Sequence, residues 1–160
     1  ISDTNNFTVN TLCSTQAACF SQSWNGSAFT CVGTGTNAQR HCTLSLYPPY
    51  WRISNNSTAT TLTIGRIRVT WAGDTNGDTT VDDININNVR RNTASSLRGA
   101  WNNVTDFSMA PGQTFASNNF LRWRGSANSG LKNNQTETYT VSFEFTDLSI
   151  YTTSPAYNPP

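Results

Sequence analysis

Residues 137–147 read ETYTVSFEFTD, a stretch in which apolar and polar side chains alternate. Side chains two positions apart lie on the same face of a strand, so this segment has one apolar face and one polar face. The apolar face holds Tyr139, Val141, Phe143 and Phe145, and the polar face holds Thr140, Ser142, Glu144 and Thr146. The alternation predicts a β-strand with one face in a core and the other in solvent.

A second alternating stretch, TLTIGRIRVTW at residues 61–71, contains one slip of phase at Gly65-Arg66. A β-bulge inserts one extra residue into a strand, so a bulge at this point would keep both phases on the buried face. The first phase holds Leu62 and Ile64, and the second holds Ile67, Val69 and Trp71.

Shorter segments follow the same rule. FLRWRG at residues 120–125 sets Leu121 and Trp123 inward, and FTCVGTGTNAQRHCTLSLY at residues 29–47 reads as two strands around a loop that contains glycine. Further strands are predicted at residues 42–47, 51–53 and 84–89, and Pro, Gly and Asn turns separate all of these segments. Many short strands with such turns predict an all-β fold, an immunoglobulin-like β-sandwich.

The length of 160 residues suits one ordinary core. We expect a single β-sandwich domain at residues 13–160, preceded by an extended N-terminal segment at residues 1–12. Charged residues make up 12% of the chain and the net charge is +1. This balance favours neither a nucleic acid nor a membrane surface as partner.

All four cysteines lie in the N-terminal third, as Cys13, Cys19, Cys31 and Cys42, without the paired C-x2-C units of zinc sites. Two disulfides are the better interpretation. Three connectivities are open, and adjacent pairing is preferred. Disulfides indicate an extracellular protein, secreted or on a cell-surface appendage. No apolar run is long enough to span a membrane, and a first residue other than Met is expected if a signal peptide was removed.

The segment GDTNGDTTVDDIN, residues 73–85, contains four of the nine carboxylates in the chain. Side-chain oxygens at alternating positions can converge on one hard cation, and Ca²⁺ accepts six to eight such ligands. The candidate ligands are Asp74, Asn76, Asp78, the carbonyl near Thr80, and Asp82 or Asp83.

This acidic segment resembles the calcium loop of dockerins and related EF-hand-like loops over residues 74–85. The resemblance implies bound calcium. Thr79 replaces the usual glycine, and Asn85 replaces the closing bidentate acid. A polar β-turn without metal is the alternative.

The sequence favours no enzyme class and no catalytic residue. The only histidine, His41, lies in a predicted loop, and the chain lacks the usual hydrolase and phosphate-binding motifs. Glu137 and Glu144 are seven residues apart, so on one strand they would face opposite sides, too far apart for a paired-carboxylate site.

Exposed tryptophan rings stack on sugars, and the chain has five tryptophans. Trp24 and Trp101 are the two expected at the surface, whereas Trp71 and Trp123 fit a core. A calcium-dependent carbohydrate-binding or adhesive module that binds surface glycans is therefore the alternative function.

Residues 50–150 contain three motifs: W-x-I-x-N from Trp51, V-x-W from Val69, and F-x-D-x-S from Phe145. Through these motifs, the region resembles the sandwich domain of secreted bacterial pilin-like surface proteins. The resemblance implies a structural subunit of an extracellular pilus-like filament, with identical subunits as partners. The N-terminal segment is polar and strand-like, unlike the apolar assembly helix of type IV pilins.

Residues 1–12 could polymerise subunits by adding a strand to the sheet of a neighbour, with Phe7 and Val9 as the side chains that fill its pockets. Pairing within the same domain is the alternative, and the tail at residues 154–160 is another candidate for assembly. Six N-x-S/T sequons are glycosylation candidates, a number close to chance in so Asn-rich a chain: Asn6, Asn25, Asn55, Asn56, Asn103 and Asn134.

Overall fold

The computed structural model describes residues 12–24, 28–32, 40–46, 51–72, 80–117, 119–125 and 138–152. These residues form one short helix and thirteen strands in antiparallel sheets, which confirms the all-β class. No helix in these ranges is long and apolar enough to cross a membrane. The elements are α1 (Gln16–Cys19), β1 (Phe20–Trp24), β2 (Ala28–Val32), β3 (Arg40–Leu46), β4 (Trp51–Asn55), β5 (Leu62–Ala72), β6 (Thr80–Ile86), β7 (Val89–Arg90), β8 (Ser96–Leu97), β9 (Trp101–Met109), β10 (Thr114–Phe115), β11 (Asn119–Gly125), β12 (Thr138–Phe145) and β13 (Ile150–Thr152).

The alternating stretch at residues 137–147 becomes β12, which lies inside a four-stranded sheet of order β13-β12-β5-β9. Its apolar residues Val141, Phe143 and Phe145 are buried, as predicted, but the prediction that its polar face lies in solvent is wrong. Ser142 and Glu144 are also buried, at 2% and 8% exposed, because Ser142 bonds to Thr152 on β13 and Glu144 pairs with Arg66 on β5. The predicted bulge is also confirmed, because the register of β5 against both β12 and β9 shifts between Ile64 and Arg66. The shift leaves the apolar residues on both sides of the bulge in the core.

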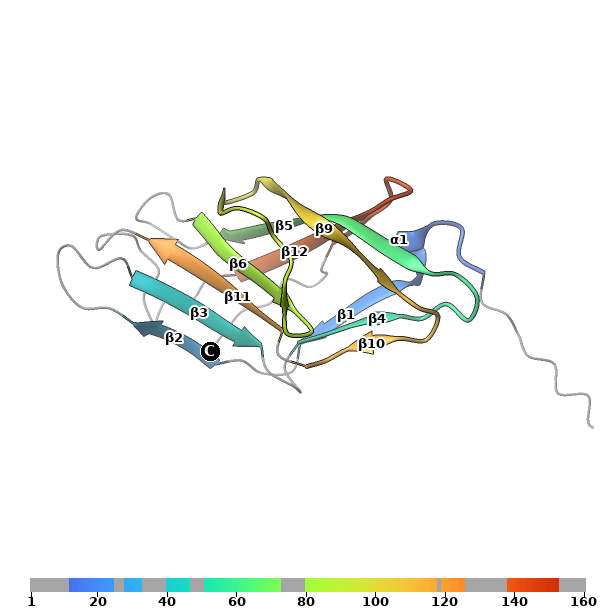
Figure 1. Ribbon diagram of the computed structural model, residues 1–160, viewed down its shortest axis with the longest axis horizontal. Helices are drawn as coiled ribbons and strands as arrows, with labels where there is room; N and C mark the ends of the chain where they lie inside the picture. The colour runs from blue at the N-terminus through green and yellow to red at the C-terminus, as the bar shows by residue number, and fades with distance from the viewer. Residues whose placement is uncertain are drawn as a thin grey trace, which may run out of the picture.

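Two further sheets have the orders β1-β4-β10 and β2-β3-β11-β6-β7, with β8 paired to β6. In the first sheet, β4 pairs with β1 and β10. In the second, β3 pairs with β2 and β11. Figure 1 shows β2, β3, β11 and β6 side by side, with β1, β4 and β10 beyond their ends. The predicted hairpin at residues 29–47 is confirmed as β2 and β3.

The strand predicted at residues 84–89 is wrong in its extent. The chain reverses at Asn87 and Asn88, whose φ angles are 55° and 64°, and returns as β7. Two consecutive left-handed residues make the type I′ turn of a tight hairpin, and asparagine is among the residues that adopt this conformation at least cost.

Aromatic side chains join the first of these sheets to the sheet of β12. The ring of Phe20 on β1 lies 4.7 Å from that of Phe143 and 5.3 Å from that of Phe145, between ring centroids. Phe107 on β9 and Phe115 on β10 lie 6.3 Å apart in the same way. Side chains of the two sheets are therefore in contact, and their buried residues belong to one hydrophobic cluster.

Buried asparagines satisfy backbone groups where strands end. Asn55, only 1% exposed, donates through Nδ2 to the carbonyls of Thr60, Met109 and Ala110. Asn119 donates in the same way to the carbonyls of Trp51 and Phe115. An amide carries two donors and an acceptor, so one such side chain can replace a missing strand partner. The W-x-I-x-N motif thus ends in a residue with a structural task.

Candidate functional site

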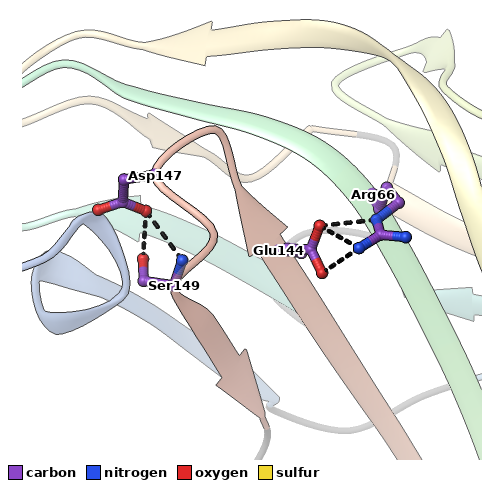
Figure 2. A network of polar contacts seen from close by, with 4 residues as sticks. All are labelled: Arg66, Glu144, Asp147 and Ser149. Carbon is purple, nitrogen blue, oxygen red and sulfur yellow. Dashed lines mark hydrogen bonds and ion pairs between the residues drawn. The ribbon is translucent and has the colours of Figure 1, made fainter.

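The turn between β12 and β13 holds α1 through the F-x-D-x-S motif. Asp147 accepts hydrogen bonds from the Ser149 backbone N–H at 3.1 Å and from the Ser149 hydroxyl at 2.5 Å (Figure 2). Its other carboxylate oxygen accepts from the backbone N–H of Gln16 at 2.8 Å, and the Ser149 hydroxyl accepts from the N–H of Ala17 at 2.9 Å. These bonds satisfy N–H groups in the first turn of α1, which have no partner within the helix.

The same contacts set the charge state of Asp147. Desolvation alone would raise the pKa of this carboxyl, but the hydrogen bonds from Ser149 and Gln16 outweigh it and hold the pKa below its ordinary value. The carboxylate form that binds α1 is therefore favoured at neutral pH.

Leu148 occupies an unusual place in this turn. Its φ angle is 64°, in the left-handed region, and its side chain is 75% exposed. A left-handed conformation costs an L-residue about 1–2 kcal/mol, and glycine is the usual residue at this point of a hairpin. Ile150, at the start of β13, is 51% exposed. We call Leu148 and Ile150 the hairpin surface.

Neither residue was predicted from the sequence as part of a functional site. The sequence feature that could have identified them is the polar turn TDLS, which directly follows an alternating strand. In this turn, leucine occupies a position where a turn residue is usual. A large apolar side chain held in a costly conformation and left in solvent suggests a role outside the fold of the chain.

The described chain from Leu12 to Cys19 lies beside this hairpin, where Gln16 and Ala17 bond to Asp147 and Ser149. Cys13 and Cys19 are joined as a disulfide, as in the preferred adjacent pairing, and Thr15 caps α1 by accepting from the N–H of Ala18. The side chain of Gln16 accepts from the N–H of Thr63 at 2.6 Å and donates to the hydroxyl of Thr146 at 3.1 Å. Leu12, which precedes this anchor, is 77% exposed.

An ion pair and an aromatic ring lie side by side on the sheet of β13, β12, β5 and β9. Arg66 donates two hydrogen bonds of 2.6 Å to the carboxylate of Glu144 (Figure 2). The guanidinium carbons of Arg66 and Arg68 lie 5.5 Å and 4.6 Å from the ring centroid of Trp101. Glu144 is thus held by a cation across the strands, and Trp101 is half-buried instead of fully exposed.

The predicted calcium ligands are described only in part. Residues 73–79 and the side chain of Asp82 lie outside the described residues, and Thr80 begins β6. Asp83 is buried, and its carboxylate lies 2.8 Å from Nε of Arg90. This arginine already pairs with Asp83, one of the two acids predicted as the last ligand. Among the described residues, no group of three or more His, Cys, Asp or Glu side chains could hold a metal.

Of the other predicted site residues, some lie among the described residues and the rest lie outside them. Asn56 and Asn103 are exposed, whereas buried Asn55 lacks the exposure that a glycan requires. Cys31 lies directly opposite Cys42 in the β2–β3 register, with both side chains outside the described set. Also outside it are Phe7, Val9, Asn6, Asn25, Asn134, residues 154–160, and the side chains of Trp24, His41 and Trp123.

A scan against family models finds no match to this chain, and searches of curated proteins and of solved structures find none either.

Proposed function

We propose that this protein is a structural subunit of an extracellular, pilus-like filament with an immunoglobulin-like β-sandwich. In this proposal, residues 1–12 of one subunit add a strand to the edge of a neighbour. The observation that carries it is the hairpin surface, where Leu148 is exposed in a left-handed conformation and Ile150 is exposed on an edge strand.

The hairpin surface suits an added strand. Among the described strands, β13 lies at the edge of its sheet and pairs only with β12, and an edge strand offers backbone groups to another chain. In our proposal, Phe7 and Val9 of the donor contact Leu148 and Ile150 of the acceptor. Burial of these side chains between subunits would offset the conformational cost at Leu148.

The anchor of the donor segment supports the same proposal. A strand that carries force between subunits must be firmly rooted in its own domain, and the Cys13–Cys19 disulfide with the bonds of Gln16 supplies such a root. The eleven residues before Leu12 reach about 36–40 Å when extended, which is enough to reach a neighbouring domain. We also propose that the subunit is secreted, that its disulfides are closed outside the cell, and that its acidic segment binds calcium.

Negative-stain microscopy and sedimentation velocity test the assembly. The full chain should form filaments, whereas the double variant Phe7→Asp, Val9→Asp should not, because an unpaired carboxylate buried between subunits costs several kcal/mol. Ile150→Lys should have the same effect from the acceptor side. A synthetic peptide of residues 1–12 added to the double variant should bind it without restoring polymers.

Two matched controls introduce the same charged residues, aspartate and lysine, at positions outside the proposed contact. Thr8→Asp places the same charge on the opposite face of the donor strand, and Val89→Lys places a lysine on a different exposed apolar residue. Both controls should still assemble. Filaments from the double variant, or closed dimers alone from the full chain, would exclude strand donation by residues 1–12 as the source of a filament.

A further inference from the structure

The described N-x-S/T sequons differ in how free their asparagine amides are. Asn55 is 1% exposed, and its Nδ2 donates to three backbone carbonyls, so a glycan at this position would remove bonds that hold the fold. Asn56 is exposed, but its Nδ2 donates to the hydroxyl of Ser21 at 3.0 Å. Asn103 is exposed, and no hydrogen bond joins its side chain to another described residue. Among the described sequons, Asn103 therefore has the amide most available for modification.

The sequon at Asn103 runs along β9 with its reactive groups on the outer face. Asn103 and Thr105 are exposed, whereas Val104 between them is 6% exposed and belongs to the core, as alternation along a strand requires. The backbone N–H of Thr105 bonds to the carbonyl of Arg91 at 3.1 Å, which leaves the Thr105 side chain free of that contact. The amide and the hydroxyl that define the sequon therefore both face solvent.

An indole ring lies next to this asparagine. Trp101 stands two positions before Asn103, so the two side chains project from the same face of β9. The register places Trp101 opposite Arg68 and Asn103 opposite Arg66. The guanidinium carbons of Arg68 and Arg66 lie 4.6 Å and 5.5 Å from the centroid of the indole ring, and these contacts hold the ring on the outer face of the sheet.

A pocket of about 190 Å³ lies beside β9, and its lining includes both Trp101 and Asn103. Residues 93–96 form another part of the lining, including the exposed hydroxyl residues Thr93 and Ser95. Among the described residues that line it, none is acidic or basic. A sugar has an apolar C–H face and polar hydroxyl groups, so it suits a site that offers an indole ring beside neutral hydroxyls.

We propose that Asn103 carries an N-linked glycan whose first sugar packs against Trp101 in this pocket. A separate glycosyltransferase would supply the glycan on a lipid-linked diphosphate. The bond between the anomeric carbon and the diphosphate oxygen breaks, and the lipid diphosphate leaves with the electron pair. The anomeric carbon then bonds to Nδ2 of Asn103, which gives up one proton to the transferase. This inference is independent of the filament, because β9 and β13 lie at opposite edges of their sheet.

Glycopeptide mass spectrometry tests the modification. The full chain, secreted with a cleavable signal from insect cells, which attach N-linked glycans, should carry a glycan on Asn103 and none on Asn55. Thr105→Ala should remove the glycan because it destroys the sequon, and the matched control Thr105→Ser should retain it. An unmodified Asn103, or a glycan on Asn55 of the folded protein, would overturn the proposal.

Thermal unfolding tests the contact with Trp101. The glycosylated chain should melt about 2–4 °C above Thr105→Ala from the same cells, the shift expected of one aromatic contact in a chain of this size. The same pair made in bacteria without N-linked glycosylation corrects for the effect of the threonine itself. When both chains also carry Trp101→Ala, the corrected difference should disappear. A difference that persists in Trp101→Ala would overturn the contact between the sugar and the indole.

Discussion

At the scale of the residue, Leu148 has an unfavourable backbone conformation and also exposes its apolar side chain to solvent. Its N–H bonds to the carbonyl of Phe145 at 2.9 Å, and the N–H of Phe145 bonds to the carbonyl of Ser149 at 3.0 Å. These two bonds close the turn and force the left-handed conformation on position 148. Fold stability alone would favour glycine there, so leucine at this position serves another purpose in our proposal.

Replacement of Leu148 by glycine should therefore stabilise the fold of the chain and weaken filament assembly. Leu148→Gly should raise the free energy of unfolding by about 1 kcal/mol, because the left-handed cost disappears and only part of the gain is lost to the more flexible unfolded chain. The same variant should weaken filament assembly. Urea unfolding measures the first effect, and sedimentation velocity measures the second.

Leu148→Ala separates the two causes. Alanine removes the apolar surface but keeps a Cβ in the left-handed conformation, so this variant should weaken assembly without the gain in stability. A glycine variant less stable than the unmodified chain would show that the leucine side chain stabilises its own domain.

At the scale of the element, the connection from β5 to β6 carries the main concentration of negative charge. Neighbouring carboxylates repel one another unless a cation lies close to them. Arg90 neutralises Asp83 across the β6–β7 hairpin. In our proposal, the oxygen ligands for calcium come from Asp74, Asn76 and Asp78, which stand at alternating positions, and from Asp82.

Calcium binding by this connection should therefore stabilise the fold. Calcium at 100 times its dissociation constant adds about 2.7 kcal/mol to the free energy of unfolding, which raises the melting temperature of a chain of this size by about 5–10 °C. Differential scanning calorimetry in calcium and in chelator should show this difference, and Asp78→Ala should abolish it. Asp106→Ala, which removes an exposed acid on β9, should retain it. Superimposable curves for the unmodified chain in the two conditions would favour a turn without metal.

At the scale of the whole molecule, the N-terminal third holds all four cysteines of the chain. The Cys13–Cys19 bond closes the loop that contains α1, whose Gln16 and Ala17 bond to the β12–β13 turn, and Cys19 is itself part of the core. Cys31 and Cys42 are direct partners in the β2–β3 register, an arrangement that suits a second bond between adjacent strands. Both pairs agree with adjacent connectivity.

We predict that both bonds are closed in the native protein. Mass spectrometry under non-reducing conditions should detect no free thiol, and fragments should link residue 13 to 19 and residue 31 to 42. Reduction should lower the free energy of unfolding by about 2–4 kcal/mol for each bond, measured by urea unfolding with and without reductant. Two free thiols in the purified protein would contradict closure of both bonds and weaken the argument for secretion.

The sequence by itself determined the all-β class, the buried face of β12, the bulge at Gly65 and the β2–β3 hairpin. These features depend on the alternation of neighbouring side chains, which a strand expresses locally. It also indicated an acidic calcium loop and a donor strand, most of whose residues lie outside the described part of the structure. Only the tertiary structure decided which strands pair, why Asn55 is buried, and that Asp147 holds Gln16 across 131 positions of the chain. It alone revealed the exposed Leu148, because burial and hydrogen bonding depend on residues that folding brings together from distant parts of the sequence.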